Sequence, residues 1–383
     1  MKTKEHWKKK IFVLAALLII VFVAGCASET PLTGQVIGAE QKEPIKIGMM
    51  LPLTGDAASW GNEVKKGAEL AYDELKNEKI NSREIEVIYE DDKCSGRDGV
   101  TAITKLITVD NIKISGGSVC SSVAMSIVPI LEANKVIHLS AAASNPVLTD
   151  AGDYIFRIWP SDSFEAQVIA DLALEQFNAE TAAVLYINND YGVGVKDAFI
   201  ERYSENKGEI RAVESFEVNA NDFKTQLMKV KTANPDAVFI ISNPSEALGL
   251  VKQLRELEIN CTVFVNGPVI ESEGFLQKAG TLAEGVIYAV PNMPLSEEYA
   301  LNYKSKFGSE PGFLSTLGYD NIMLLFNAIK YCNGDNPDCV KEYLYTVKDY
   351  PGASGNITFD ENGDVIKDFV IKTVKDGKAV NLN

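Results

Sequence analysis

Two serines stand at the start of a predicted helix, shortly after a pair of glycines. The stretch Gly116-Gly117-Ser118-Val119-Cys120-Ser121-Ser122 follows an apolar run with Ile112 and Ile114, which predicts a strand, and a helical pattern begins near Val123. A helix N-terminus presents unpaired N–H groups and a partial positive charge, and serine hydroxyls add further donors. The turn therefore predicts a site for a small anion such as a carboxylate, although an ordinary serine N-cap without a ligand has the same pattern.

Other candidate binding residues also follow predicted strands. They fall into two sets along the chain, the first being Trp60, Ser121, Ser122 and Ala142 to Ser144, and the second Tyr191, Asn243 and the loop from Asn266 to Glu271. In open α/β sheets, ligands bind at the carboxyl ends of the strands. We expect two hinged lobes to bring the sets face to face across a cleft that binds a small molecule.

The order of the predicted elements indicates two α/β lobes. Strand patterns alternate with helical patterns of about 10–15 residues, which is typical of parallel sheets with helices on both faces. The alternation pauses near Trp159-Pro160 and then begins again. Three helical patterns follow residue 296, and Asn362-Gly363 predicts a hairpin turn between residues 357–359 and 365–373. We expect the late helices to pack on the first lobe and the hairpin on the second, which gives three crossovers and a hinge.

The first residues predict a targeting segment. Lysines precede the apolar run 11–24, and Val23-Ala24-Gly25-Cys26 resembles the lipobox of secreted lipoproteins. We expect a lipidated Cys26 that anchors an extracytoplasmic body to the cell membrane. The predicted organisation is a signal peptide at 1–25, a tether at 26–44, a first lobe at 45–158 plus 290–354, and a second lobe at 159–289 plus 355–383.

The cysteines after Cys26 suit an oxidising compartment. A disulfide between Cys332 and Cys339 could close a turn-rich loop. Cys94 and Cys120 each follow a predicted strand and could lie at the same edge of a sheet. Cys261 is then expected to be a buried free thiol.

The sequence contains no catalytic constellation. Ser121 and Ser122 are not in a G-x-S-x-G motif, and His138, the only histidine after the targeting segment, lies in an apolar run. The stretch from Tyr191 begins like G-x-G-x-x-G, but Asp197 replaces the third glycine, which argues against dinucleotide binding. Without a CxxC motif or a second histidine after the targeting segment we expect no metal site. Without a nucleophile–base pair we expect no enzymatic activity, and we expect no cofactor. The net charge of −16 argues against nucleic acid as a partner.

Together these features resemble the type I periplasmic substrate-binding proteins of the branched-chain amino acid (leucine/isoleucine/valine) family, the capture components of ABC importers. The resemblance covers about residues 45–383 and rests on motifs in a fixed order, including Pro52-Leu53-Thr54-Gly55, Trp60-Gly61, Asp91-Asp92-Lys93-Cys94, Cys120-Ser121-Ser122, Ala142-Ala143-Ser144-Asn145-Pro146, Asn189-Asp190-Tyr191-Gly192 and Gly318-Tyr319-Asp320. It implies an α/β fold of two lobes, each a mostly parallel sheet with helices on both faces. It also implies that the family's first-lobe disulfide falls on Cys94 and Cys120.

The resemblance further implies roles for the first-lobe residues and Tyr191. Ser121 would bind the ligand's α-carboxylate, Ser144 would add a hydroxyl, and the backbone of Ala142 would contact an ammonium group. Trp60 would form a wall of the side-chain pocket, and Tyr191 would close over the ligand from the second lobe.

The ammonium partner departs from the family pattern. The family places an acidic residue just after a Gly-Pro pair, but here Gly267-Pro268 is followed by Val269. Glu271 and Asp320 are therefore the candidates for this role.

We therefore expect a solute-binding lipoprotein that captures a small amphoteric ligand, such as a branched-chain or other amino acid, and delivers it to an ABC permease. The expected partners are this ligand, the permease subunits and the membrane, and the protein is expected to be a monomer. The alternatives are a ligand-sensing module for a receptor and, if no acid reaches the ammonium, a binder of amides, urea-like compounds or aromatic acids.

Overall fold

The computed structural model of the protein describes residues 42–272 and 274–382. The predicted signal peptide, Cys26 and nearly all of the predicted tether lie outside these residues. The chain from Lys42 onward groups into one compact unit. Within the described ranges, none of the helices has the length and apolar character needed to cross a membrane.

The first sheet has five strands, which pair in parallel in the order β2-β1-β3-β4-β5. The strands are β1 (Ile45–Leu51), β2 (Ile85–Asp91), β3 (Ile114–Gly117), β4 (Ile137–Ser140) and β5 (Ile155–Arg157). Most residues of β1, β3 and β4 are buried, as expected for a parallel sheet with both faces covered. The predicted alternation of strands and helices is confirmed here.

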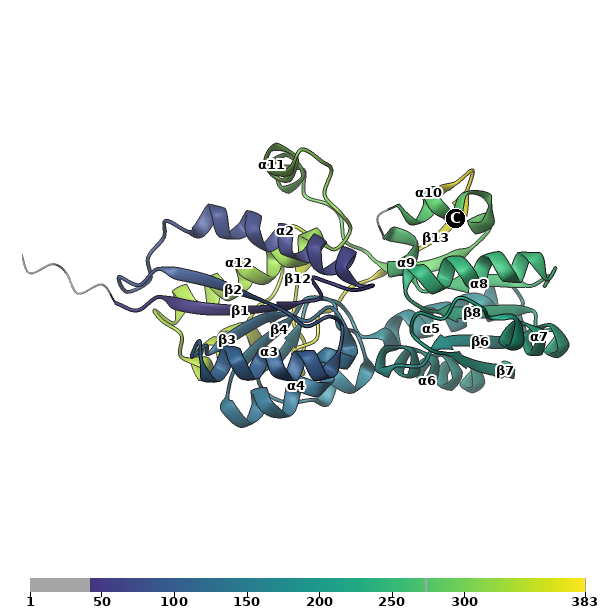
Figure 1. Ribbon diagram of the computed structural model, residues 1–383, viewed down its shortest axis with the longest axis horizontal. Coiled ribbons are helices and arrows are strands. Elements are labelled where there is room, and N and C mark those ends of the chain that lie inside the picture. The colour runs from purple at the N-terminus through teal and green to yellow at the C-terminus, as the bar shows by residue number, and fades with distance from the viewer. Residues whose placement is uncertain (1–41, 273, 383) are drawn as a thin grey trace, which may run out of the picture. The chain divides into compact units, whose positions relative to one another are not determined.

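Helices cover both faces of this sheet (Figure 1). On one face lie α2 (Ala58–Leu75) and α12 (Ser315–Tyr331), and on the other α3 (Gly96–Thr108) and α4 (Ser121–Asn134). Gly318 lets α12 approach α2 closely, since a Cβ at this position would lie 1.8 Å from the carbonyl oxygen of Val64. The late segment around α12 therefore belongs to the first lobe, as predicted.

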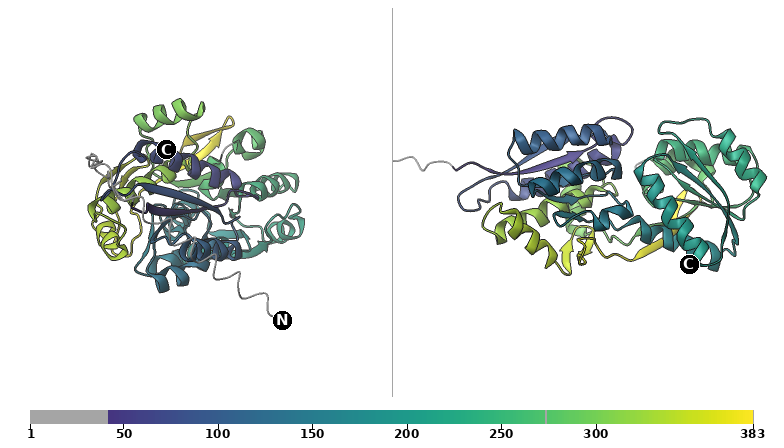
Figure 2. Two further views of the ribbon diagram at one scale, coloured as in Figure 1. Left: turned by 60° about the vertical axis from the view of Figure 1, so that its left-hand side comes forward. Right: turned by 90° about the horizontal axis from the view of Figure 1, so that it is seen from below.

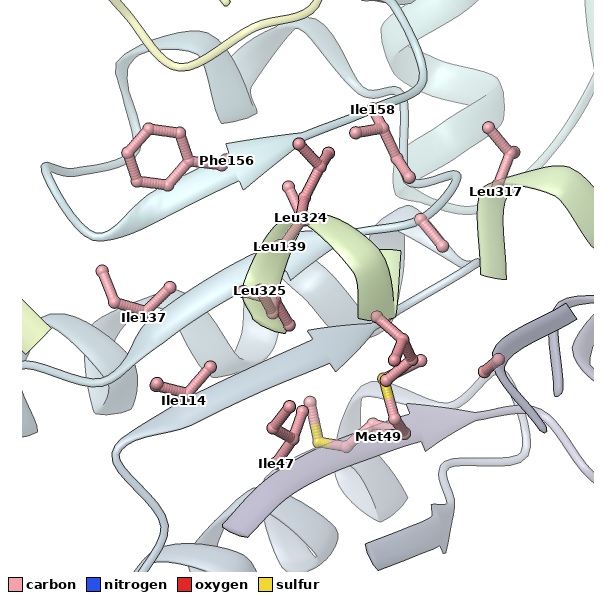
Figure 3. Packing of buried hydrophobic residues seen from close by; sticks show 14 of the residues in the cluster. Ile47, Met49, Ile114, Ile137, Leu139, Phe156, Ile158, Leu317, Leu324 and Leu325 are labelled. Carbon is pink, nitrogen blue, oxygen red and sulfur yellow. The ribbon is translucent and has the colours of Figure 1, made fainter. Parts of the chain in front are cut away.

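Part of the core of the first lobe lies between its sheet and α12 (Figure 3). Leu324 and Leu325 of α12 lie over Ile114, Ile137 and Leu139 of the sheet, and all five side chains are buried. This packing holds the strand ends in place, and the loops that leave them carry the candidate site.

The second sheet has seven strands in the order β14-β13-β10-β9-β8-β6-β7. Its parallel strands are β6 (Thr181–Ile187), β7 (Glu209–Phe216), β8 (Ala237–Ile241), β9 (Thr262–Val265) and β10 (Ile287–Pro291). Two further strands complete it by antiparallel pairing, β13 (Phe369–Lys375) with β10 and β14 (Lys378–Asn381) with β13.

Alternate residues of the central strands face two different helix layers, because side chains of a strand alternate with a period of two. Val184 and Phe239 pack with helices α5 (Asp162–Glu175) and α6 (Asp190–Glu205). Leu185 and Ile240 pack with α7 (Lys224–Ala233) and α8 (Pro244–Glu256). The second lobe therefore has helices on both faces, as predicted (Figure 2).

Shorter elements connect these layers. They are η1 (Pro146–Asp150), α9 (Gly267–Glu271), α10 (Phe275–Ala279), η2 (Gly280–Ala283), α11 (Glu297–Phe307), α13 (Pro337–Tyr345) and the two-stranded ribbon of β11 (Tyr350–Gly352) and β12 (Gly355–Ile357). Only α9 and the loop before α12 contribute to the site described below.

The chain reverses at the predicted turn, Asn362-Gly363, but the predicted hairpin does not extend into a ladder of strands. Phe359 and Val365, on either side of Asn362-Gly363, form only an isolated antiparallel bridge. The hairpin with a continuous ladder joins β13 to β14 around Asp376-Gly377, where φ is +52° and +69°. A two-residue turn with two positive φ angles suits Asp-Gly as well as Asn-Gly. The last strands do join the second sheet, beside β10, as predicted (Figures 1 and 2).

The chain passes between the two sheets after β5, after β10 and again before β13. Ile357, Phe359 and Val365 are buried in the core of the first lobe. We therefore propose that the last crossover lies beyond Val365 and not at the predicted boundary of residue 355. The other lobe boundaries stay predictions.

Candidate ligand-binding site

A pocket lies where loops from both predicted sets meet. All of the predicted binding residues except Glu271 and Asp320 line it, and its lining consists of Trp60, Cys94, Val119, Cys120, Ser121, Ser122, Ala142, Ser144, Trp159, Asn189, Tyr191, Asn243, Asn266, Pro268 and Leu314. Its free space is about 600 Å³, part of which is open to solvent. These residues carry neutral side chains, and many of them are aromatic or aliphatic.

The start of α4 is fixed by its backbone and by a disulfide. Gly116 and Gly117 belong to β3, and Gly117 has φ +93°. A Cβ at Gly117 would lie 2.2 Å from the carbonyl oxygen of Met50, so only glycine fits there. The N-cap residue Cys120 is bonded to Cys94 and makes no side-chain hydrogen bond to the first turn. Within that turn the N–H of Val123 donates to the Cys120 carbonyl at 3.1 Å, so the N–H groups of Ser121 and Ser122 are the ones available to a ligand in the pocket.

Ser121 is the first residue of α4 and is 2% exposed. Its hydroxyl oxygen accepts hydrogen bonds from the backbone N–H groups of Ser144, at 3.3 Å, and Asn145, at 3.2 Å. Because a hydroxyl has two acceptor lone pairs and one proton, Ser121 is left with a proton to donate. Its predicted role in binding a carboxylate stays a prediction, and the hydrogen bonds favour the required donor.

Ser144 uses its hydroxyl as a hydrogen-bond donor within the protein, whereas Ser121 uses its hydroxyl as an acceptor. Its hydroxyl donates to Oδ2 of Asp162 at 2.8 Å, and the backbone N–H of Asp162 donates to the Ser144 carbonyl at 2.8 Å. The Ser144 oxygen therefore remains an acceptor for a ligand N–H group. Ala142 is held nearby by its N–H, which donates to the Ser118 carbonyl at 3.3 Å.

Aromatic and aliphatic side chains form the apolar part of the pocket. Trp60 comes from α2, and Trp159 follows β5 and packs edge-on against Phe313 with ring centroids 5.8 Å apart. The Nε1 atom of Trp60 is buried and has no hydrogen-bond partner in the described part of the chain. These residues suit an apolar ligand group, with one N–H donor beside it.

The second lobe contributes Tyr191 and three amide side chains. Asn189 caps α6 by accepting from Gly192 N–H at 2.9 Å, which places Tyr191 in the first turn. Asn266 bonds the backbone of Ser242 with both ends of its amide. Asn243 is the N-cap of α8 and makes no side-chain cap hydrogen bond. Asn243 is therefore the amide best able to turn towards a ligand.

The two predicted acidic partners lie elsewhere, and that prediction is corrected. Glu271 Oε1 accepts from the Tyr288 hydroxyl at 2.9 Å and from Lys372 Nζ at 2.7 Å, beside a different depression. Asp320 is fully buried in α12, where its carboxylate accepts the N–H groups of the ribbon turn, at Ala353 and Ser354. Both carboxylates bind other parts of the protein, and neither reaches the pocket.

The cysteines and His138, the other reactive side chains considered in the sequence, are either bonded in disulfides or at least partly buried. The expected disulfides Cys94–Cys120 and Cys332–Cys339 are both present. Cys261 is a partly buried free thiol, and burial raises its pKa to about 11. His138 lies buried in β4 against the hydroxyl of Ser115, and burial lowers its pKa to about 3. Among the described residues, no group of three or more His, Cys, Asp or Glu side chains is placed to hold a metal ion.

Sequence reasoning missed Trp159, Asn189 and Leu314 as lining residues. In the sequence, Trp159 marks only the pause between the two predicted lobes. Asn189 precedes Asp190-Tyr191 as an N-cap, a pattern that is visible in the sequence. Leu314 comes from the loop before α12, and its position depends on tertiary packing alone.

Comparisons with known proteins agree with this architecture. The profile of a family described as periplasmic binding protein matches residues 44–379. A Leu/Ile/Val-binding protein homologue of Brucella melitensis is 28% identical over 348 residues, which cover 88% of this chain and 93% of that protein. A leucine-binding protein of Thermotoga maritima has a TM-score of 0.82 and 27% identity, over 88% of this chain and 98% of its own. An ABC-transporter solute-binding protein of Rhodopseudomonas palustris, solved with 3,4-dihydroxybenzoic acid, has a TM-score of 0.77 and 26% identity, over 89% and 96% of the two chains.

Two α/β lobes with three crossovers and a pocket lined by both lobes define the class of two-lobed solute-binding proteins. The chain belongs to the periplasmic binding protein family, and within it to the type I proteins of the branched-chain amino acid group. The predicted family and fold class are thereby confirmed.

Proposed function

We propose that the protein captures a small aliphatic amino acid, with leucine, isoleucine and valine as the first candidates, and delivers it to an ABC permease. The observation that carries this proposal is the start of α4, where the Ser121 hydroxyl and the first-turn N–H groups adjoin an apolar wall. A carboxylate bound by these donors would place an aliphatic side chain against Trp60 and Trp159. The names of the Brucella and Thermotoga relatives support the same ligand class.

Aromatic acids are the second candidates. The pocket lining has no charged side chain to pair with an ammonium, and two tryptophans line it. The Rhodopseudomonas palustris relative was solved with a dihydroxybenzoic acid. An aromatic acid would use the same carboxylate donors at the start of α4, so the two candidates differ only at the other end of the ligand.

The proposal also covers the location of the protein, its partner and its oligomeric state. Family membership supports an extracytoplasmic location, a permease as partner and a binding role without catalysis. We add that Cys26 carries a lipid that anchors the protein to the membrane and that the protein acts as a monomer. A receptor-coupled sensor is the competing role, and loss of ligand uptake on deletion of the protein would distinguish transport from sensing.

Leucine, isoleucine or valine is expected to raise the unfolding midpoint of the protein and to change the fluorescence of Trp60 and Trp159. A ligand at 100 times its Kd stabilises the folded state by about 2.7 kcal/mol. A thermal-shift screen of aliphatic amino acids, benzoates and amides, followed by calorimetric titration, measures the effect.

Leucinol is the matched control for this screen, because it keeps the leucine side chain and amino group but lacks the carboxylate. Stabilisation by leucinol equal to that by leucine would contradict carboxylate capture at α4. Stabilisation by amides alone would contradict both candidate ligand classes.

A further inference from the structure

A buried carboxylate holds the turn of the two-stranded ribbon. This ribbon turn, residues 352–355, joins β11 to β12. Asp320 reaches it from α12, and its two carboxylate oxygens accept the backbone N–H groups of Ala353 at 2.6 Å and Ser354 at 2.9 Å. Asp320 is fully buried, and hydrogen bonds from N–H groups to a carboxylate are strong because the acceptor is charged. The helix α12 therefore fixes the position of the ribbon turn.

A lysine binds the same turn through its carbonyl groups. Lys367 Nζ donates to the carbonyl oxygens of Ser354 at 2.8 Å and Asn356 at 3.1 Å. Ser354 thus gives its N–H to a negative group and its carbonyl to a positive group. Hydrogen bonds linked in this way polarise and strengthen one another.

The charges of Asp320 and Lys367 favour each other across the turn. Burial raises the pKa of Asp320, and the hydrogen bonds from Ser354 and Ala353 and the charge of Lys367 oppose that rise. Burial lowers the pKa of Lys367, and the charge of Asp320 opposes that fall. The two side chains therefore act on the ribbon turn as one unit, which we call the clamp.

Lys367 belongs to the last crossover between the lobes. This segment runs from Val365, which is buried in the core of the first lobe, to Phe369, the first residue of β13 in the second sheet. The Lys367 side chain therefore ties a segment that connects the lobes to the ribbon of the first lobe.

The second crossover binds the ribbon turn as well. It covers residues 292–296, between β10 and α11. The Ser296 N–H donates to the Ala353 carbonyl at 3.3 Å. Pro294 packs on the turn at Gly355, where φ is +82° and a Cβ would lie 2.8 Å from Pro294 Cδ, so only glycine suits this position. Two of the three crossovers thus meet at one short turn.

The two crossovers are also bound to each other. The Asn292 N–H donates to the Asp368 carbonyl at 2.7 Å, one residue beyond the last pair of the antiparallel ladder of β10 and β13, Pro291 and Phe369. The two segments therefore leave the second lobe as a pair. Between this bond and the ribbon turn, the backbone is left to bend at residue 293 and at residues 366–367.

We propose that Asp320 and Lys367 clamp the ribbon turn as the pivot on which the second and last crossovers bend, and that they thereby limit how far the lobes separate without ligand. The inference goes beyond the proposed function, because neither residue lines the pocket. It gives Asp320, which does not reach a ligand, a positioning role at the hinge.

The clamp acts on ligand binding through the arrangement of the lobes. Both lobes line the pocket, so a ligand makes all of its contacts only when the lobes are close together. A looser pivot lets the unliganded lobes separate further and lowers the fraction of molecules that are ready to bind. The apparent Kd rises by the inverse of that fraction.

Small-angle X-ray scattering of the unliganded protein tests the clamp directly. Lys367→Met keeps the length of the side chain but removes its charge and its hydrogen bonds. The radius of gyration is expected to be larger for this variant than for the unsubstituted protein without ligand, and equal for the two in saturating leucine. Calorimetric titration is expected to give a Kd for leucine that is about three- to tenfold higher.

Asp320→Asn is the second variant, because it weakens the hold on the same turn from α12 while keeping the size of the side chain and one acceptor oxygen. It is expected to change both quantities in the same direction. The double variant should change them by less than the sum of the single effects, since both residues act on one turn.

Lys330→Met is the matched control. Lys330 also lies in the first lobe, on α12, and forms a surface ion pair with Glu78 at 2.8 Å, away from both crossovers. Its substitution should leave the radius of gyration and the Kd unchanged.

The outcomes separate a role at the hinge from a purely structural one. Lower unfolding midpoints for Lys367→Met and Asp320→Asn, with an unliganded radius of gyration equal to that of the unsubstituted protein, would overturn the inference. The scattering comparison is made without ligand, so it decides the inference even if leucine does not bind and the proposed function fails.

Discussion

Replacement of Ser121 by alanine is expected to weaken binding of a carboxylate ligand about 5- to 150-fold, which corresponds to about 1–3 kcal/mol. The substitution removes the hydroxyl proton that would be donated to the ligand. It also removes the acceptor of the N–H groups of Ser144 and Asn145, so the loop on the other side of the pocket loses its support. Calorimetric titration with the best ligand from the screen gives the change in Kd.

Ser126→Ala is the matched control for Ser121→Ala. Ser126 lies in the same helix, and its hydroxyl donates to the Ser122 carbonyl one turn back, outside the pocket lining. Its substitution should leave Kd unchanged. Equal affinities of the two variants would show that Ser121 does not bind the carboxylate.

Removal of the Cys94–Cys120 disulfide by a double substitution to serine is expected to cost about 3–4 kcal/mol of folding free energy and to weaken ligand binding. The bridge closes a loop with a sequence separation of 26 residues, which restricts the unfolded chain. Both of its cysteines line the pocket, and Cys120 is the N-cap of α4. Chemical denaturation and ligand titration measure the two effects separately.

The second disulfide supplies the control. Cys332 and Cys339 are separated by 7 residues, away from the pocket, so their removal is expected to cost about 2–3 kcal/mol. Ligand affinity should not change in that variant. A loss of affinity of the same size in both double variants would mean that binding responds to general stability and not to the anchoring of α4.

Local patterns were enough to predict the lobes and much of the pocket. Ser121, Tyr191 and Asn243 each stand where a strand gives way to a helix, and strand ends of a parallel sheet lie at one edge. The turn before α4 was also predictable, because only glycine suits the backbone at Gly117. For such residues, position follows from the element to which they belong.

The positions of the acidic residues near the pocket could not be predicted in this way. Glu271 is four residues from Gly267, but the short helix α9 turns its side chain towards Tyr288 and Lys372. Asp162 and Glu165 look like ordinary acids in the first turn of a helix, where they are common for electrostatic reasons. Only the packing of α5 behind the pocket distinguishes them.

Because the chain crosses between the two sheets three times, each lobe is built from segments that lie far apart in the sequence. This arrangement also determines when each lobe can fold. The first lobe needs α12, which packs against α2 from more than 200 positions further along the chain, and the second needs β13 to pair with β10. Contacts between such distant segments form only after long loops have closed, which slows folding. Neither lobe can therefore be completed during synthesis of its first part, and the two are expected to fold as one cooperative event once the C-terminal residues are present.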